Sequence, residues 1–160
     1  MLDLNEMASL EYPSIKALSY NTDGWNDYKA DYINTLLLSL GIPILGIQEH
    51  MQLKPNLYRI KKHFPNYELF SVPAYKDNSK IHSGRPIGGI SFLYSQNLNK
   101  YVTRITCPDS LRVQGLKVNL PQINLLFINA YFPTDIRGRD ESEVLQTLQD
   151  IKFIIPFVEI

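Results

Sequence analysis

The chain has 160 residues, of which 44% are hydrophobic and 20% charged, and this balance indicates a folded domain rather than a disordered segment. Its 16 basic and 16 acidic residues cancel, so net charge gives no support to a nucleic-acid partner, although a local basic stripe would be enough to bind one. The single cysteine, Cys107, cannot form an internal disulfide, which favours an intracellular setting, nuclear or cytoplasmic. The apolar stretches are too short and interrupted to span a membrane, and the acidic N-terminus does not resemble a signal peptide.

In chain order, residues 1–12 are expected to form a leader and residues 13–160 to belong to a single domain. The first half predicts an alternation of strands and helices. Its elements are a strand over 15–20, a helix with Asp27 as N-cap and Gly41 as its stop, a buried strand over 42–47 and a short helix over 56–63. The second half predicts mostly strands, over 67–75, 87–94, 101–106, 111–118 and 123–131, then a helix over 141–155. This order predicts an α/β (α+β) layered fold with a mixed sheet.

Three polar side chains follow the first two predicted strands. Asn21 and Asp23 come directly after the first strand, and Glu49 comes after the second, which is continuously apolar. Ligand sites gather at the carboxyl ends of strands in layered α/β folds. A carboxylate held there suits a hard cation such as Mg²⁺, which prefers oxygen ligands and keeps several waters. The Asn21 amide can both donate and accept hydrogen bonds, so it suits a phosphate or an attacking water.

Each of these residues also has a simpler interpretation. Asn21 and Asp23 precede Gly24 and are typical turn formers, and Glu49 can solvate a strand end. His50 is expected to lie at the surface or to support the site rather than to bind metal. The pair Gly88-Gly89 indicates close backbone packing more than a phosphate cradle.

Other residues give weaker signals. His63 and His82 lack a metal-ligand partner at useful spacing, so a zinc site is not expected, and neither a Walker A loop nor a Gly-x-Ser-x-Gly elbow is present. Cys107 is interpreted as a strand-end residue rather than a reactive thiol. Two groups of basic side chains are interpreted as solvated faces by default: Lys54, Arg59, Lys61 and Lys62, and then Lys76, Lys80, His82 and Arg85.

Four segments in order resemble the motifs of the endonuclease/exonuclease/phosphatase superfamily. These are residues 19–25 (SYNTDGW), 44–50 (ILGIQEH), 84–93 (GRPIGGISFL) and 129–133 (NAYFP). Details such as Gly24-Trp25-Asn26 and Gly84-Arg85-Pro86 are most similar to the endonuclease domains of LINE-type non-LTR retrotransposons. The resemblance implies an incomplete four-layer α/β sandwich of the DNase I-like type and Mg²⁺-dependent (possibly Mn²⁺-dependent) phosphodiester hydrolysis of DNA.

The resemblance also implies a role for each matching residue. Glu49 would bind the metal, with Asp23 beside it as an outer metal group. Asn21 and Tyr131 would act in the catalytic site on the phosphate or the nucleophile. Arg85 and Asn129 would bind phosphate or DNA.

Two later motifs of the superfamily, a Gly-Asp-Phe-Asn segment and a terminal Ser-Asp-His, do not occur in this sequence. The domain is therefore expected to be the N-terminal portion of the family's domain, truncated at its C-terminus, with little or no activity and with an exposed apolar face that favours self-association. Two alternatives stay open: a phosphatase of the same superfamily, and a non-catalytic remnant that at most binds a partner.

Overall fold

The computed structural model describes residues 14–76, 84–132 and 141–157. The expected leader over 1–12 and the residues Lys80 and His82 lie outside this described part. The first half of the fold contains β1 (Ala17–Asn21), α2 (Asp27–Leu40), β2 (Ile44–Gln48), α3 (Tyr58–Lys61), β3 (Tyr67–Val72) and β4 (Ile90–Ser95). The second half contains β5 (Val102–Thr106), β6 (Val113–Leu120), β7 (Ile123–Ala130) and α4 (Glu141–Ile154). Short 3₁₀ segments cover Lys54–Asn56, Gln96–Tyr101 and Ile155–Phe157.

The strands form two sheets that face each other. The first has the order β1-β2-β4-β3, in which β1 and β2 are parallel and the other pairs antiparallel. The second is antiparallel with the order β5-β6-β7. The mixed sheet expected from the sequence is therefore confirmed.

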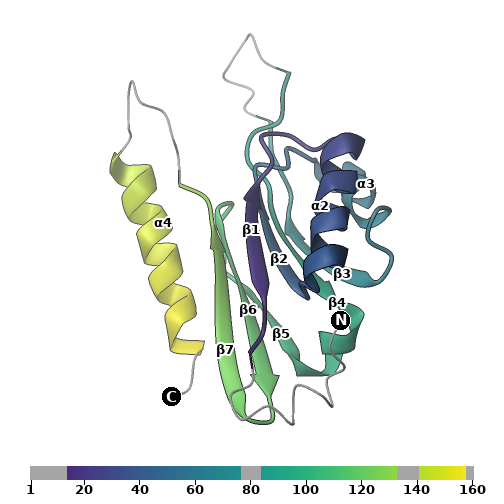
Figure 1. The fold of residues 1–160 in the computed structure, drawn as a ribbon. Helices are drawn as coiled ribbons and strands as arrows, with labels where there is room; N and C mark the ends of the chain where they lie inside the picture. Colours follow the sequence, from purple (N-terminus) through teal and green to yellow (C-terminus); the bar gives the residue numbers. More distant parts are fainter. Residues whose placement is uncertain (1–13, 77–83, 133–140, 158–160) are drawn as a thin grey trace.

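Three hydrophobic clusters hold the layers together. Between the sheets, Ile44 and Phe92 of the first sheet pack with Leu116 and Val118 of the second. On the outer faces, α2 covers the first sheet and α4 covers the second, as Figure 1 shows. The result is a layered helix–sheet–sheet–helix sandwich, which confirms the predicted fold class.

Helix α2 illustrates how local signals set an element's ends. The Asn26 side chain, on an extended residue with φ −146°, accepts a hydrogen bond from the Lys29 N–H at 2.8 Å. Asn26 is therefore the N-cap and Asp27 is the first helical residue, so the prediction of Asp27 as the cap was wrong by one position. At the other end Gly41 takes the left-handed conformation, with φ 60°, and ends the helix as predicted.

Proline and glycine shorten two of the predicted strands. β3 ends at Val72 because Pro73 has no N–H to donate to the ladder. β4 begins at Ile90, after Gly88 and Gly89, both of which have positive φ. Both glycines lie beside the turn that follows β2.

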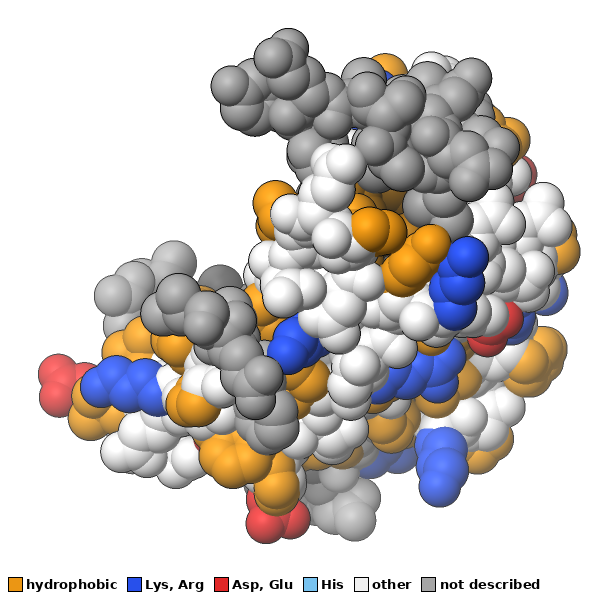
Figure 2. All heavy atoms as spheres, turned by 90° about the horizontal axis from the view of Figure 1, so that it is seen from below, with side chains coloured by type: hydrophobic (Ala, Val, Ile, Leu, Met, Phe, Trp, Pro, Cys, Tyr) orange, Lys and Arg blue, Asp and Glu red, His pale blue; other side chains and the backbone are white. Residues whose placement is uncertain are grey.

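In the part of the chain that the structure describes, one side of the sandwich is open. β1 and β7 are the edge strands of their sheets (Figure 1), and a groove of about 170 Å³ runs between them, lined by Ala17, Leu18, Ile44, Phe92, Phe127 and Ile128 among others. Figure 2 shows the molecule from below, where hydrophobic side chains are visible among polar and charged ones. On α4, Ile154 is buried over Gly115 of β6, whereas Leu145 and Leu148 are 58% and 43% exposed. Ile155, in the 3₁₀ segment that follows α4, is 51% exposed. None of the helices in the described residues is long and apolar enough to cross a bilayer.

Candidate active site

The parallel pairing of β1 with β2 brings the predicted residues to one edge. Asn21 pairs with Gln48 in register, so the chain leaves both strands at the same height. The contact continues beyond the strands, because the Gly24 N–H donates to the Glu49 carbonyl at 2.7 Å and the Trp25 N–H donates to the His50 carbonyl at 3.1 Å. The loop after β1 and the turn after β2 therefore form one rigid unit.

Glu49 is joined to the second sheet through Tyr131. The Tyr131 hydroxyl donates a hydrogen bond to Glu49 Oε1 at 2.5 Å, although the two residues are 82 positions apart. Tyr131 stands just past β7, where its N–H donates to the Arg112 carbonyl at 2.9 Å and extends the ladder by one bond. Both side chains are half-buried. The structure thus assembles a carboxylate and a phenol, one from each sheet, at the shared edge.

Asn21 is exposed at this edge, and its side chain has a local role. Its Oδ1 accepts a hydrogen bond from the Asp23 N–H at 3.0 Å, which is the turn-forming contact that the sequence left open. The turn carries Asp23 with a left-handed backbone, φ 41°. The amide NH₂ brings two further donors to the edge.

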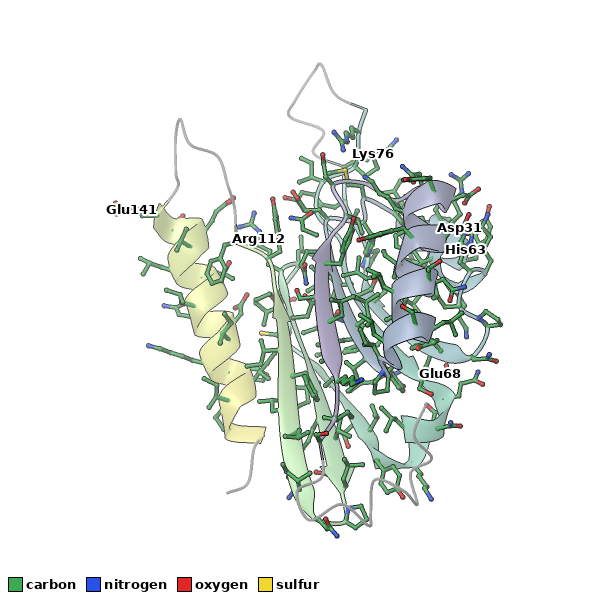
Figure 3. All side chains as sticks on the ribbon, viewed as in Figure 1. Asp31, His63, Glu68, Lys76, Arg112 and Glu141 are labelled. Atoms are coloured by element: carbon green, nitrogen blue, oxygen red, sulfur yellow. The ribbon has the colours of Figure 1, made fainter. Side chains whose placement is uncertain are left out.

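Asp23 and Arg85 form an ion pair across the mouth of the site. Arg85 Nη2 lies 2.9 Å from Asp23 Oδ1, and Nε donates to the Met51 sulfur at 3.0 Å. The Arg85 side chain is 60% exposed and the Asp23 side chain 78%, so the ion pair orients the two groups more than it stabilises the fold. A guanidinium held here places positive charge beside the Glu49 turn, and Figure 3 shows Lys76 and Arg112 at the same end of the molecule.

Lys29 is a supporting residue that the sequence reasoning missed. From the first turn of α2, its Nζ donates to the carbonyl groups of Asp23 at 3.2 Å and Gly24 at 2.9 Å, and also to that of Thr22. One ammonium group therefore satisfies three successive carbonyls of the loop. The signal in the sequence was faint, since it amounts to a lysine at the third helical position after a turn.

Asn129 lies in a position that differs from its expected role at a phosphate. It is buried between the sheets, 3% exposed, and its Nδ2 donates to the carbonyls of Ile47 at 3.0 Å and Ser91 at 2.9 Å. Its Oδ1 accepts from Gln48 Nε2 at 2.6 Å. The amide thus joins the two sheets directly beneath Glu49, and we leave Asn129 out of the proposed contacts with substrate.

His50 is completely buried rather than at the surface. Its ring lies against Gly89, and its Nδ1 accepts the Gln52 N–H at 3.0 Å. Burial lowers the pKa of His50 to about 4, so the ring is neutral at physiological pH. A neutral ring with Nδ1 already accepting a hydrogen bond supports the site from below, which is one of the two roles that the sequence suggested for it.

The oxygen atoms at this edge suit a hard cation that takes only one or two ligands from the protein. Within the described ranges, no three His, Cys, Asp or Glu side chains come close enough together to hold a metal among themselves. One half-buried carboxylate with an amide and a second carboxylate nearby is nevertheless the pattern of a Mg²⁺ that keeps most of its waters and takes one or two protein ligands. Glu49 is the first candidate ligand, because Asp23 is already paired with Arg85.

No protein-family model matches the sequence, and no curated protein matches it. Solved structures do match the fold. AP endonuclease LMAP from Leishmania major is 13% identical with a TM-score of 0.58, and the match covers 86% of this chain and 45% of that one. The endonuclease domain of TRAS1, a telomere-specific non-LTR retrotransposon, is 13% identical with a TM-score of 0.54, covering 89% and 54%. D. rerio TDP2, solved with a single-strand DNA product, is 16% identical with a TM-score of 0.54, covering 84% and 54%.

These likenesses show the fold alone, the DNase I-like α/β sandwich that the sequence motifs implied. The chain spans about half the length of the structures that it matches. Its own site must therefore be argued from its own residues.

Proposed function

We propose that this chain carries a Mg²⁺-dependent site for phosphodiester hydrolysis of DNA, of the retrotransposon endonuclease type, acting inside the cell. The observation that supports it best is the contact between Tyr131 and Glu49, which holds a half-buried carboxylate at the edge where β1 and β2 end. A hydrogen bond that served stability alone could lie anywhere in the sandwich, whereas this contact lies at the edge that also carries Asn21, Asp23 and Arg85.

Each residue has a proposed role. Glu49 binds the metal ion, and Tyr131 fixes the rotamer of Glu49 while its hydroxyl faces the phosphate position. Arg85 attracts the phosphate through charge, and Asn21 donates from its amide. When bound, Mg²⁺ or Mn²⁺ supplies Lewis-acid stabilisation of the phosphoryl and leaving oxygens.

A second candidate function, a non-catalytic remnant, is favoured by one observation. Among the described residues, the site offers no histidine free to act as a base, since His50 is buried and already accepts a backbone hydrogen bond. Groups that act as a unit in catalysis fail together when one is missing. We therefore expect turnover to be weak.

A plasmid-nicking assay separates these two functions. The full chain, incubated with supercoiled DNA and Mg²⁺, should convert it slowly to the nicked form, and Glu49→Gln should abolish the conversion. Glu68→Gln is the matched control, because this glutamate lies on β3 at the other end of the sheet (Figure 3) and should leave the rate unchanged. Nicking that survives Glu49→Gln would refute the site, and complete absence of nicking at high enzyme would favour the remnant.

A further inference from the structure

The backbone that presents Glu49 has an unusual shape. Glu49 has φ 54° and Met51 has φ 55°, so two residues in the left-handed region flank His50. Residues other than glycine rarely adopt this conformation, and it persists only where surrounding contacts fix it. The turn therefore needs an identifiable support if Glu49 is to keep its direction.

Hydrogen bonds hold the backbone of this turn from two sides. On one side, the His50 N–H donates to the Gly89 carbonyl at 3.2 Å and the Met51 N–H donates to the Gly88 carbonyl at 2.9 Å. On the other side, the Thr22 hydroxyl donates to the Glu49 carbonyl at 3.0 Å. The segment before β4 thus serves as the floor of the turn.

The His50 ring fills the space between the turn and this floor. A Cβ at Gly89 would come within 2.4 Å of His50 Cε1 and 2.6 Å of Nδ1, so only glycine leaves room for the ring. Because Nδ1 accepts the Gln52 N–H, the ring proton resides on Nε2, which faces the Ser71 hydroxyl at 3.3 Å. Volume and hydrogen bonds both fix the ring in place.

We propose that His50 is a positioning residue for the Glu49 carboxylate and that Gly89 is the glycine that admits it. The proposal rests on the proposed function only in treating Glu49 as the metal ligand. The ring holds the left-handed turn from below, and the turn aims Glu49 at the metal position and at the Tyr131 hydroxyl. Residues that orient a ligand from behind typically change metal affinity by about 10- to 100-fold when they are removed.

The test is Mn²⁺ binding to the full chain, followed by the electron paramagnetic resonance signal of the free ion, under conditions where circular dichroism reports fully folded protein. His50→Ala should weaken binding by about 10- to 100-fold. His50→Asn should bind nearly as well as the original chain, because its Oδ1 occupies the place of Nδ1 and accepts the same Gln52 N–H. Leu98→Ala, a buried change in the opposite part of the core, is the control for lost stability alone and should not alter binding.

A double substitution tests the pairing of ring and glycine. Gly89→Ala should weaken Mn²⁺ binding because its methyl group displaces the ring. Because Gly89 has φ 88°, Gly89→Ala also strains the backbone independently of the ring. If ring and glycine act through one contact, the His50→Ala, Gly89→Ala double variant should lose less binding than the sum of the two single losses, whereas fully additive losses would overturn the pairing.

Glu49→Gln distinguishes failure of this inference from failure of the proposed function. If Glu49→Gln leaves Mn²⁺ binding unchanged, the metal assignment itself is wrong. If Glu49→Gln abolishes binding while His50→Ala binds like the original chain, or if His50→Asn is as weak as His50→Ala, the positioning role is overturned and the metal assignment stands.

Discussion

The buried amide of Asn129 makes a sharp prediction about stability. Asn129→Ala removes two donors to the carbonyls of Ile47 and Ser91 and the acceptor of Gln48 Nε2, all in the interior between the sheets. Each buried polar group that loses its partner costs about 1–3 kcal/mol. Gln48 keeps its bond to the Ser19 hydroxyl at 3.1 Å, so it is only partly stranded. We therefore expect a loss of about 3–5 kcal/mol in the free energy of unfolding.

Such a loss is large for a domain of this size, whose total stability is about 5–15 kcal/mol. Urea unfolding followed by circular dichroism would show a lower midpoint with an unchanged slope, and the melting temperature should fall by about 10 °C. Asn124→Ala is the matched control, since Asn124 is an exposed asparagine on the same strand. A loss below about 1 kcal/mol for Asn129→Ala would refute the view that this amide joins the sheets.

Two further predictions concern pH and association. In metal-free buffer, the folded protein keeps His50 neutral down to pH about 4, whereas the unfolded chain protonates it near 6.5. The unfolded state then binds more protons in this range, so the His50 contribution, about 3 kcal/mol, is complete above pH 6.5 and is lost as the pH falls to 4. Unfolding free energies at pH 7 and pH 5 should diverge less for His50→Asn, and an equal pH dependence would contradict the assignment. Separately, the open side with its exposed α4 residues should cause self-association that Leu148→Glu reduces and Leu38→Glu, on the outer face of α2, does not. Light scattering after size exclusion would measure both variants, and a monomer at every concentration would disprove the association.

Much of the fold could be predicted because its signals are local. The buried strand β2 is announced by the continuous apolar run over residues 42–47, and the ends of α2 are marked by a capping amide and a glycine. The places where the prediction failed are also local in origin. Asp27 and Asn26 are both good caps, and only the backbone conformation decides between them.

The candidate site was predictable only in part. Asn21 and Glu49 were visible because each follows the end of a predicted strand. The contact of Tyr131 with Glu49 joins residues 82 positions apart. The resemblance of ordered motifs implied a role for Tyr131, but the contact itself was not predicted. The burial of His50 could not be predicted, because the space for its ring is created by Gly89, almost forty residues later.

The alternation of side chains along β7 has a consequence for how the sequence of this strand can vary. Phe127, Asn129 and Tyr131 all face the first sheet, whereas Leu126, Ile128 and Ala130 face α4. Inserting or deleting one residue within β7 would turn its side chains by half a period and exchange these two sets. The same slip that withdrew the phenol from Glu49 would move the Asn129 amide out of the interior and place Ile128 or Ala130 there. Asn129 thus helps to fix the register of β7, since its amide finds its buried hydrogen-bond partners in only one register. The same register directs the Tyr131 hydroxyl toward Glu49.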